Sequence, residues 1–213
     1  MAVVGIVPAG GSGERLGADR PKAFVVCAGR PLIEWSLDVL ESVCDRVIVA
    51  LPQGYDDGPD RVRGGESRSA SVRNAVAAVE EQEADLFVVH DAARPLITRD
   101  LVDRCIGAIE PGIDGAIAAI PMTDTVKEVA PDGRVLKTLD RSTLWAVQTP
   151  QVFRADILRR ALERDAAALA AATDDAWLVD DVGGVITVVE SYPENLKVTR
   201  ESDLRIAEAL LAH

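Results

Sequence analysis

Aromatic residues and cysteines are scarce in this chain of 213 residues. Because aromatic side chains make up only 4% of it, the core must be built largely from Val, Leu, Ile and Ala, as in a parallel sheet flanked by helices. The three cysteines, Cys27, Cys44 and Cys105, are odd in number, widely spaced and without a C-x-x-C pair, which excludes a disulfide framework and a zinc site. We therefore predict that each is a small core residue.

The N-terminus carries no basic leader, and its apolar run stops at Pro8. A run of this length is too short for a signal peptide or a membrane span. We therefore expect a reduced, cytoplasmic compartment.

Basic residues are outnumbered, with 23 Lys and Arg against 35 Asp and Glu and a net charge of −12. This balance argues against a nucleic-acid binder, which needs a basic face. A cluster of cations must instead be local and directed at a small ligand. Hydrophobic residues make up 48%, which excludes disorder. The length fits one large domain or two small ones. Because no long linker divides the chain, we predict a single domain over residues 1–213.

Apolar runs alternate with helical patterns along the chain, which is typical of βαβ units. We predict strands at residues 3–7, 46–50, 86–90, 115–120 and 185–190. We predict helices at residues 32–43, 69–81, 98–109, 155–172 and 201–212, with Thr98 as an N-cap. The predicted fold class is α/β, with a mostly parallel sheet flanked by helices.

Residues 126–129 and 135–139 interrupt this alternation with two short β-like runs joined by Pro131-Asp132-Gly133, a strong turn signal. We predict an inserted β-hairpin. Such a hairpin has few core residues of its own and needs something to pack against. A dimer partner would serve.

A glycine-rich segment, Pro-Ala-Gly-Gly-Ser-Gly at 8–13, follows the first predicted strand and precedes Arg15 and Lys22. Backbone N–H groups in such a loop can turn toward a phosphate. The segment lacks the Gly-Lys-Ser/Thr of a Walker A loop, and Leu16 stands where a dinucleotide fingerprint has its third glycine. Arg15 and Lys22 are candidates to hold a triphosphate from two sides. The alternative is a tight turn with two solvated cations.

A second Gly/Ser loop, Gly64 to Ser71, leads into a predicted helix. Its free N–H groups are candidates to read a base edge or a phosphate, and the alternative is a capped helix start.

His90 and Asp91 follow a predicted central strand, where α/β proteins bind ligands. Asp91 is a candidate ligand for Mg²⁺ that bridges phosphates. The alternative is a salt bridge between Asp91 and Arg94 that holds the loop. We interpret His90 as structural rather than catalytic.

Weaker signals lie in the last third of the chain. Asp174-Asp175 is compatible with a helix cap, and Asp180-Asp181 with a solvated helix end. Trp145 and Trp177 fit the core or an interface better than a base-stacking role.

Taken together, these segments resemble the 2-C-methyl-D-erythritol 4-phosphate cytidylyltransferases of the non-mevalonate isoprenoid pathway. The matching motifs occur in family order over nearly the whole chain. They are Pro-Ala-Gly-Gly-Ser-Gly-x-Arg-Leu-Gly at 8–17, Pro21-Lys22, Gly-Gly-Glu-x-Arg-x-x-Ser-Val at 64–72, His-Asp-Ala-Ala-Arg-Pro at 90–95, Asp124-Thr125, Asp-Arg-x-x-Leu-Trp-x-x-Gln-Thr-Pro-Gln at 140–151, Thr173-Asp174-Asp175 and Asn-Leu-Lys-Val-Thr at 195–199.

The resemblance implies a Rossmann-like fold, a homodimer and an inserted dimerisation arm at residues 123–143. It implies a CTP site with Arg15, Lys22 and Lys197 as catalytic residues. The implied nucleotide-binding residues are Ala9, Gly10, Gly11, Gly13, Gly65, Glu66, Ser71 and Asp91, and Asp91 also lies by Mg²⁺. The implied methylerythritol phosphate site contains Asp91, Arg94, Thr149, Thr173 and Lys197, with Thr125 and Arg141 from the other subunit.

The implied reaction is attack of an acceptor phosphate oxygen on the α-phosphorus of CTP, with pyrophosphate leaving. It requires no nucleophilic side chain, because its barrier is mainly anion repulsion and orientation. We therefore expect Arg15, Lys22, Arg94, Arg141 and Lys197 to converge on one pocket. Two alternatives stay open: a cytidylyltransferase for another polyol phosphate such as ribitol 5-phosphate, and a catalytically silent nucleotide-binding module.

Overall fold

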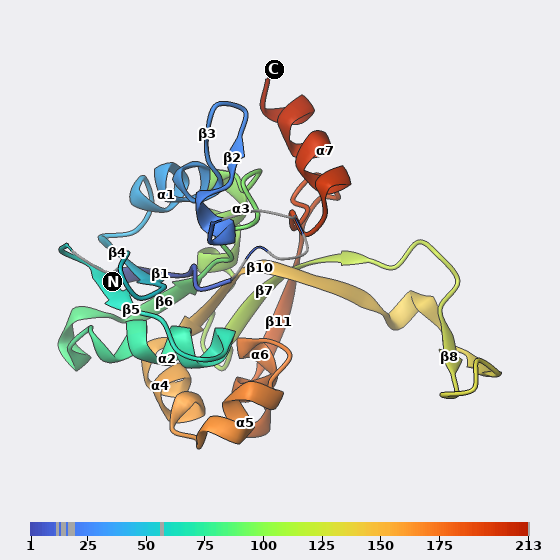
Figure 1. Ribbon diagram of the computed structural model, residues 1–213. Helices are drawn as coiled ribbons and strands as arrows, with labels where there is room; N and C mark the ends of the chain where they lie inside the picture. The colour runs from blue at the N-terminus through green and yellow to red at the C-terminus, as the bar shows by residue number, and fades with distance from the viewer. Residues whose placement is uncertain (12, 14–15, 17–19, 56–57, 213) are drawn as a thin grey trace.

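A seven-stranded sheet forms the centre of the computed structural model, which describes residues 1–11, 13, 16, 20–55 and 58–212. The strand order is β11-β7-β10-β6-β1-β4-β5 (Figure 1). The strands are β1 (Val3–Pro8), β4 (Arg46–Leu51), β5 (Arg61–Arg63), β6 (Leu86–Val89), β7 (Gly115–Pro121), β10 (Trp145–Arg154) and β11 (Ile186–Glu190). All neighbours are parallel except β10, which runs antiparallel to both β6 and β7. The predicted mostly parallel α/β sheet is confirmed.

Helices cover both faces of the sheet, because alternate residues of its central strands point to opposite sides. Val4 and Ile6 of β1 face one core, formed with α2 (Arg68–Ala77), α4 (Ala155–Leu162), α5 (Ala166–Ala171) and α6 (Asp175–Asp181). Val3 and Val7 face the other, formed with α1 (Leu32–Glu41) and α3 (Arg99–Gly107). The apolar residues of β1 are therefore buried on both sides, as the sequence predicted for a central strand.

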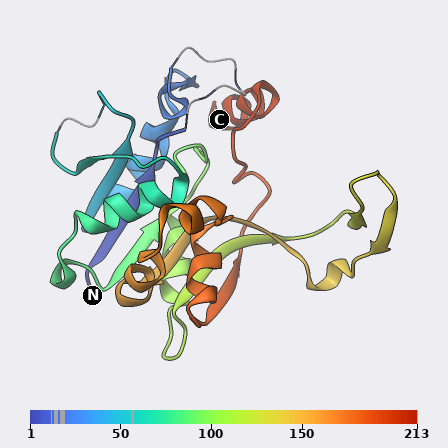
Figure 2. The same ribbon diagram turned by 60° about the horizontal axis from the view of Figure 1, so that its bottom comes forward.

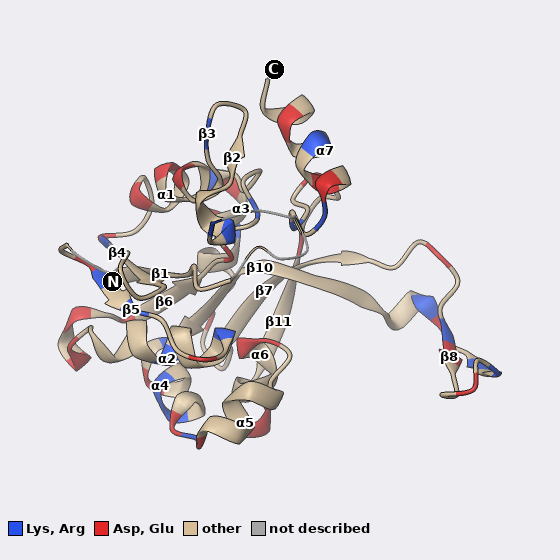
Figure 3. Ribbon diagram, viewed as in Figure 1, with Lys and Arg blue, Asp and Glu red and all other residues tan. Residues whose placement is uncertain are grey.

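The remaining elements lie around these layers. Helix α7 (Glu201–Leu211) packs beside the two-stranded sheet of β2 (Val26–Cys27) and β3 (Arg30–Pro31). Among the residues that the structure describes, short 3₁₀ turns are formed by η2 (Lys22–Phe24), η3 (Glu81–Glu83) and η4 (Arg141–Thr143). Figure 3 shows Asp and Glu residues in α1 and α7, so part of the negative charge lies on these two helices.

The five predicted strands are confirmed to within one residue at either end, and Thr98 is the N-cap of α3. Cys27, Cys44 and Cys105 are all free and buried, as predicted. The predicted single helix at 155–172 is wrong, because the Asp165 side chain accepts a hydrogen bond from the backbone of Ala168 and starts α5 as a new helix.

Several elements were not predicted, namely β2, β3, β5, β10 and α6. Strand β10 contains polar residues and Pro150, which follows a cis peptide bond, and its register against β7 shifts between Val147 and Gln151.

Asp174 is the N-cap of α6 and Asp181 is its last residue, so the predicted helix cap and helix end are confirmed. Trp145 and Trp177 are 39% and 44% exposed, so neither lies in the core, and a place at an interface stays a prediction.

The predicted hairpin is formed by β8 (Lys127–Val129) and β9 (Val135–Thr138), which pair antiparallel. Every residue of both strands is exposed, including Val129, Val135 and Leu136. The hairpin extends far from the sheet and its helices (Figure 2). The chain thus carries an arm with apolar side chains on its surface.

Within the part of the chain that the structure describes, none of the helices is both long enough and apolar enough to cross a bilayer.

Candidate active site

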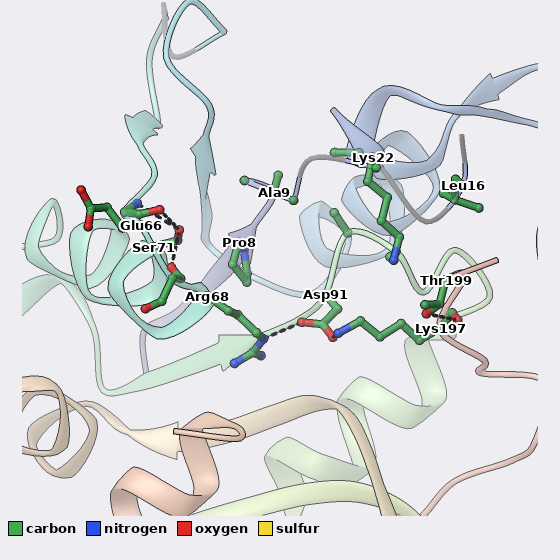
Figure 4. A pocket seen from close by; sticks show the side chains of 18 residues that line it. Pro8, Ala9, Leu16, Lys22, Glu66, Arg68, Ser71, Asp91, Lys197 and Thr199 are labelled. Carbon is green, nitrogen blue, oxygen red and sulfur yellow. Dashed lines mark hydrogen bonds and ion pairs between the residues drawn. The ribbon is translucent and has the colours of Figure 1, made fainter. Parts of the chain in front are cut away.

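A cavity of about 550 Å³ lies where the chain leaves β1 and β6 and enters α2 (Figure 4). This larger cavity is where the glycine-rich loop, the second Gly/Ser loop and the segment after His90 meet. Its lining contains the predicted residues Ala9, Gly10, Gly11, Gly13, Lys22, Gly65, Glu66, Ser71, Asp91 and Lys197. Arg15 lies outside the described residues. The structure therefore brings the described members of the predicted nucleotide set to one place.

The start of α2 forms a tight wall of the larger cavity. Ser67 caps the helix by accepting from the backbone N–H of Ala70 at 3.1 Å, so a capped helix start is confirmed. The backbone N–H of Gly65 donates to Ser71 Oγ at 3.0 Å. A Cβ at Gly65 would lie 2.5 Å from Cβ of Ala70 and 2.8 Å from its carbonyl carbon, so the turn requires glycine.

A second cavity, of about 260 Å³, adjoins the first. This smaller cavity is lined by Arg94, Val147, Gln148, Thr149, Gln151, Thr173 and Asp174. Arg68, Asp91 and Lys197 line both cavities. The residues predicted to bind the acceptor, apart from the two in the arm, therefore line this smaller cavity, next to the predicted nucleotide-binding residues.

An ion-pair network stands at the boundary between the two cavities. Asp91 accepts from Nε of Arg68 at 2.8 Å and lies 2.6 Å from Nζ of Lys197, and the two cations approach it from opposite sides (Figure 4). Arg68 also donates through Nη1 to Asp175 at 2.6 Å. Although burial raises the pKa of Asp91, these two cations hold it well below its usual range. Asp91 is therefore a carboxylate near neutral pH.

The alternative salt bridge between Asp91 and Arg94 is not the arrangement found. Nη1 of Arg94 donates to the backbone oxygen of Asn195 at 2.7 Å, while Asp91 pairs with Arg68 and Lys197. Burial lowers the pKa of Arg94, with its charge still faced by Asp91. Arg94 is thus a buried cation fixed against the smaller cavity.

His90 lies behind the site and is fully buried. Its Nδ1 lies 3.0 Å from Oγ1 of Thr149, and its Nε2 lies 3.2 Å from the backbone oxygen of Arg94. Thr149 also accepts from the backbone N–H of Asp91 at 3.0 Å. These contacts agree with the structural interpretation of His90.

The arm residues lie apart from both cavities. Thr125 and Arg141 belong to neither lining among the described residues, and the Arg141 guanidinium donates to the backbone oxygen of Thr123. Of the five cations expected to converge on one pocket, Lys22 lines the larger cavity, Arg94 lines the smaller one and Lys197 lines both. A contribution of Arg141 from a partner subunit stays a prediction.

Sequence reasoning missed Arg68 and Asp175. Arg68 stands within the matched motif at 64–72, but no role was assigned to it. One signal was available, because Arg68 is the first residue of α2, where the helix dipole disfavours a cation. A carboxylate partner would offset this effect. Nothing in the sequence indicated that this partner is 107 residues away.

A divalent metal fits this site only together with substrate phosphates. Among the residues that the structure describes, no group of three or more Asp, Glu, His or Cys is placed to hold a metal. Mg²⁺ commonly uses one or two carboxylates and completes its shell with phosphate oxygens and water. Asp91, at the boundary of the two cavities, suits that kind of site once a cation partner moves away.

A mostly parallel sheet with a glycine-rich loop and clustered cations at the carboxyl ends of its strands defines an α/β protein that binds phosphorylated ligands at that edge. The model of the 2-C-methyl-D-erythritol 4-phosphate cytidylyltransferase family matches residues 3–213. The chain belongs to this family.

Individual relatives agree with this assignment. A 2-C-methyl-D-erythritol 4-phosphate cytidylyltransferase of Rubrobacter xylanophilus is 42% identical, over 98% of this chain and 94% of the relative. The crystal structure of the enzyme of the same name from Thermus thermophilus superposes with a TM-score of 0.82 at 34% identity and covers 100% of both chains. The enzyme of that name from Francisella tularensis gives 0.82 at 30% identity, over 98% of this chain and 99% of that one.

Proposed function

We propose that this protein joins CTP and 2-C-methyl-D-erythritol 4-phosphate to give 4-diphosphocytidyl-2-C-methyl-D-erythritol and pyrophosphate. The observation that carries the proposal is the pair of adjoining cavities that share Arg68, Asp91 and Lys197. The larger cavity takes CTP and the smaller one takes the acceptor. Their common boundary is where the acceptor phosphate meets the α-phosphorus.

The reaction is an in-line displacement in which the P–O bond to pyrophosphate breaks as the acceptor oxygen bonds to phosphorus. Lys22 and Arg15 hold the triphosphate and stabilise the charge that develops on the leaving pyrophosphate. Lys197, at the boundary, stabilises the charge shared by nucleophile and phosphorus. Cations fixed by the fold are needed here because the net charge of −12 repels both substrates.

The base and the acceptor are held by different walls. Gly65, Glu66 and Ser71 line only the larger cavity, where their backbone and small polar groups are suited to a pyrimidine edge. Arg94 and Thr173 line only the smaller cavity, where a buried guanidinium is suited to a phosphate.

We further propose that Asp91 holds Mg²⁺ when the substrates bind. A bound Mg²⁺ would supply charge neutralisation of the phosphates. Asp91 would be available for this role once the Lys197 ammonium turns from the carboxylate toward a substrate phosphate.

The arm at residues 123–143 is proposed to complete the site of a second subunit in a homodimer. Its support is the exposure of Val129, Val135 and Leu136, since apolar side chains on a two-stranded hairpin gain stability only by packing elsewhere. Thr125 and Arg141 would then contact the acceptor bound by the partner.

A cytoplasmic location is part of the proposal. Three free, buried cysteines suit a reducing compartment, where disulfides do not persist.

Pyrophosphate release, measured with CTP, Mg²⁺ and one acceptor at a time, tests the function. We expect release with 2-C-methyl-D-erythritol 4-phosphate and much less with ribitol 5-phosphate. A preference for ribitol 5-phosphate would overturn the acceptor assignment. CTP binding without release for either acceptor would favour the silent module.

A further inference from the structure

We infer that Asp175 and Arg68 form a positioning pair: Asp175 fixes Arg68, and Arg68 holds the Asp91 carboxylate in place when Lys197 turns from Asp91 toward a substrate phosphate. This inference deepens the proposed function and rests on it for the identity of the phosphate. Asp175 belongs to neither cavity lining, and Arg68 acts here through Asp91.

The geometry of Asp175 sets it apart from the surface ion pairs of this chain. Its side chain is fully buried, whereas both members of the Arg164–Asp181 pair are partly exposed. Oδ2 of Asp175 accepts from Nη1 of Arg68 at 2.6 Å. Taking a carboxylate out of water is expensive, and an apolar side chain at such a position is often as stable. Burial raises the pKa of Asp175 and the Arg68 cation opposes that rise, so a carboxyl group at this position depends on its pairing with Arg68.

The Arg68 guanidinium uses two different nitrogen atoms to bind two carboxylates. Nε binds Asp91 at 2.8 Å while Nη1 binds Asp175, so one planar guanidinium joins two carboxylates on different elements. Arg68 begins α2 and Asp175 begins α6, and both helices are packed into the same core. The hydrogen bond from Nη1 to Asp175 therefore fixes the orientation in which Nε points toward Asp91.

Lys197 is the partner that is free to leave. Its side chain is 42% exposed, against 26% for Arg68, and its ammonium is a single point charge on a flexible stem. A phosphate arriving at the boundary can draw that ammonium away from Asp91. Arg68 cannot follow, because its second donor is bound to Asp175. Asp91, whose side chain is only 10% exposed, then keeps one cation instead of becoming an unpaired buried charge.

An unfolding experiment without substrate tests this directly. Lys197→Ala mimics the departure of the lysine, and we combine it with Arg68→Gln and, separately, with Asp175→Asn. We expect Lys197→Ala alone to shift the urea midpoint slightly, because Arg68 remains on Asp91. In the Arg68→Gln or the Asp175→Asn background, Lys197→Ala should shift the urea midpoint by a clearly larger amount. Asp181→Asn is the matched control, because Asp181 lies on α6 like Asp175 but pairs with Arg164. It should leave the effect of Lys197→Ala unchanged.

Equal shifts in all backgrounds would overturn the inference, because Arg68 would then not be supporting Asp91. This outcome is independent of turnover, so it is distinguishable from a failure of the proposed function.

Kinetics supply a second readout that a merely structural pair would not move. We expect Asp175→Asn and Arg68→Gln each to lower kcat/KM for the acceptor by about tenfold or more, since small misplacements at a reacting centre have effects of this size. For Asp175→Asn, KM for CTP should change by no more than about twofold, because Asp175 lines neither cavity and the Gly65–Ser71 and Ser67–Ala70 hydrogen bonds do not involve its side chain.

The double variant distinguishes positioning from independent action. Because Asp175 acts through Arg68, the double variant should be no slower than Arg68→Gln alone. Arg68→Lys should not restore activity, since one ammonium cannot join both carboxylates in this geometry. Multiplicative losses in the double variant, or full activity of Arg68→Lys, would contradict the inference.

Discussion

The hydroxyl of Thr149 lies 3.0 Å from Nδ1 of His90, and its neighbours fix which group is the donor. Nε2 of His90 faces the backbone oxygen of Arg94, which can only accept, so Nε2 carries the proton. Burial lowers the pKa of His90 to about 4, so the ring is neutral near pH 7 and Nδ1 is bare. Thr149 therefore donates to His90.

The same hydroxyl accepts from the backbone N–H of Asp91. Its single proton is thus already used, and only a lone pair remains for a ligand. Thr149 consequently serves the site mainly by fixing the backbone of Asp91, and a direct contact with the acceptor would be to a donor group rather than to a phosphate oxygen.

Thr149→Val should therefore destabilise the fold. It would leave Nδ1 of His90 and the N–H of Asp91 without a partner in the interior, at about 1–3 kcal/mol each. Urea unfolding should show a loss of about 2–6 kcal/mol. Thr149→Ser, which keeps the hydroxyl, should lose about 1 kcal/mol. A loss for Thr149→Ser with none for Thr149→Val would show that the methyl group and not the hydroxyl matters.

The buried neutral His90 predicts a pH dependence of stability. Its pKa is about 4 in the folded protein against 6.5 ordinarily, so the unfolded chain binds more protons between these values. The contribution of His90 to stability should therefore fall as pH falls through this window, by about 2 kcal/mol between pH 7 and pH 5. Asp91, whose depressed pKa starts from 3.8, contributes only at lower pH.

His90→Gln removes this titration and is the comparison to make. Unfolding free energies of the two proteins between pH 5 and pH 7 should differ in slope. The other histidine of the chain, His213, is common to both and cancels. Parallel slopes would mean that His90 is not buried in its neutral form.

Nucleotide selectivity should depend on the turn at Gly65. We expect CTP to be preferred over UTP and ATP, and Gly65→Ala to weaken that preference, because its Cβ would collide with the Ala70 backbone and move the loop. Relative kcat/KM values for the three nucleotides give the answer. Gly107→Ala is a suitable control, since nothing lies within 4 Å of its Cβ position. Equal use of CTP and ATP by the wild type would show that this loop does not read the base.

The arm can be tested by mixing two inactive chains. Lys22→Ala should lower activity by about 10²-fold, the usual effect of removing one preorganised charge, and Arg141→Ala should impair use of the acceptor. A mixed dimer with arms exchanged has one site with both defects and one with neither. Activity should therefore recover to a fraction of the wild-type level when the subunits exchange.

Confirmed heterodimers without recovered activity would rule out the shared site. As a matched control, Lys22→Ala is taken alone through the same exchange conditions, and its activity should not recover.

Sequence predicted the parts of the site that follow strands or lie in loops. Asp91 was predicted because it directly follows an apolar strand, and Gly65 because it lies in a Gly/Ser-rich loop. Lys197 was predicted from the family resemblance. The pairing of Arg68 with Asp175 was not predictable, because it depends on how α2 and α6 pack against one sheet. Strand β10 was missed for a related reason, since its polar residues Gln148 and Gln151 are buried only because they face other polar groups at the site.

The central claim is that the larger cavity binds CTP and the smaller one binds the acceptor. Ser71 lines only the first cavity and Thr173 only the second, so Ser71→Ala and Thr173→Ala form a matched pair. Initial rates of pyrophosphate release, with one substrate varied and the other saturating, give both KM values for each variant. Ser71→Ala should raise KM for CTP by about tenfold and leave KM for the acceptor unchanged, and Thr173→Ala should do the reverse, as expected for one lost hydrogen bond to a charged or polar ligand. A rise in KM for CTP with Thr173→Ala, or equal rises in both constants for both variants, would contradict this account.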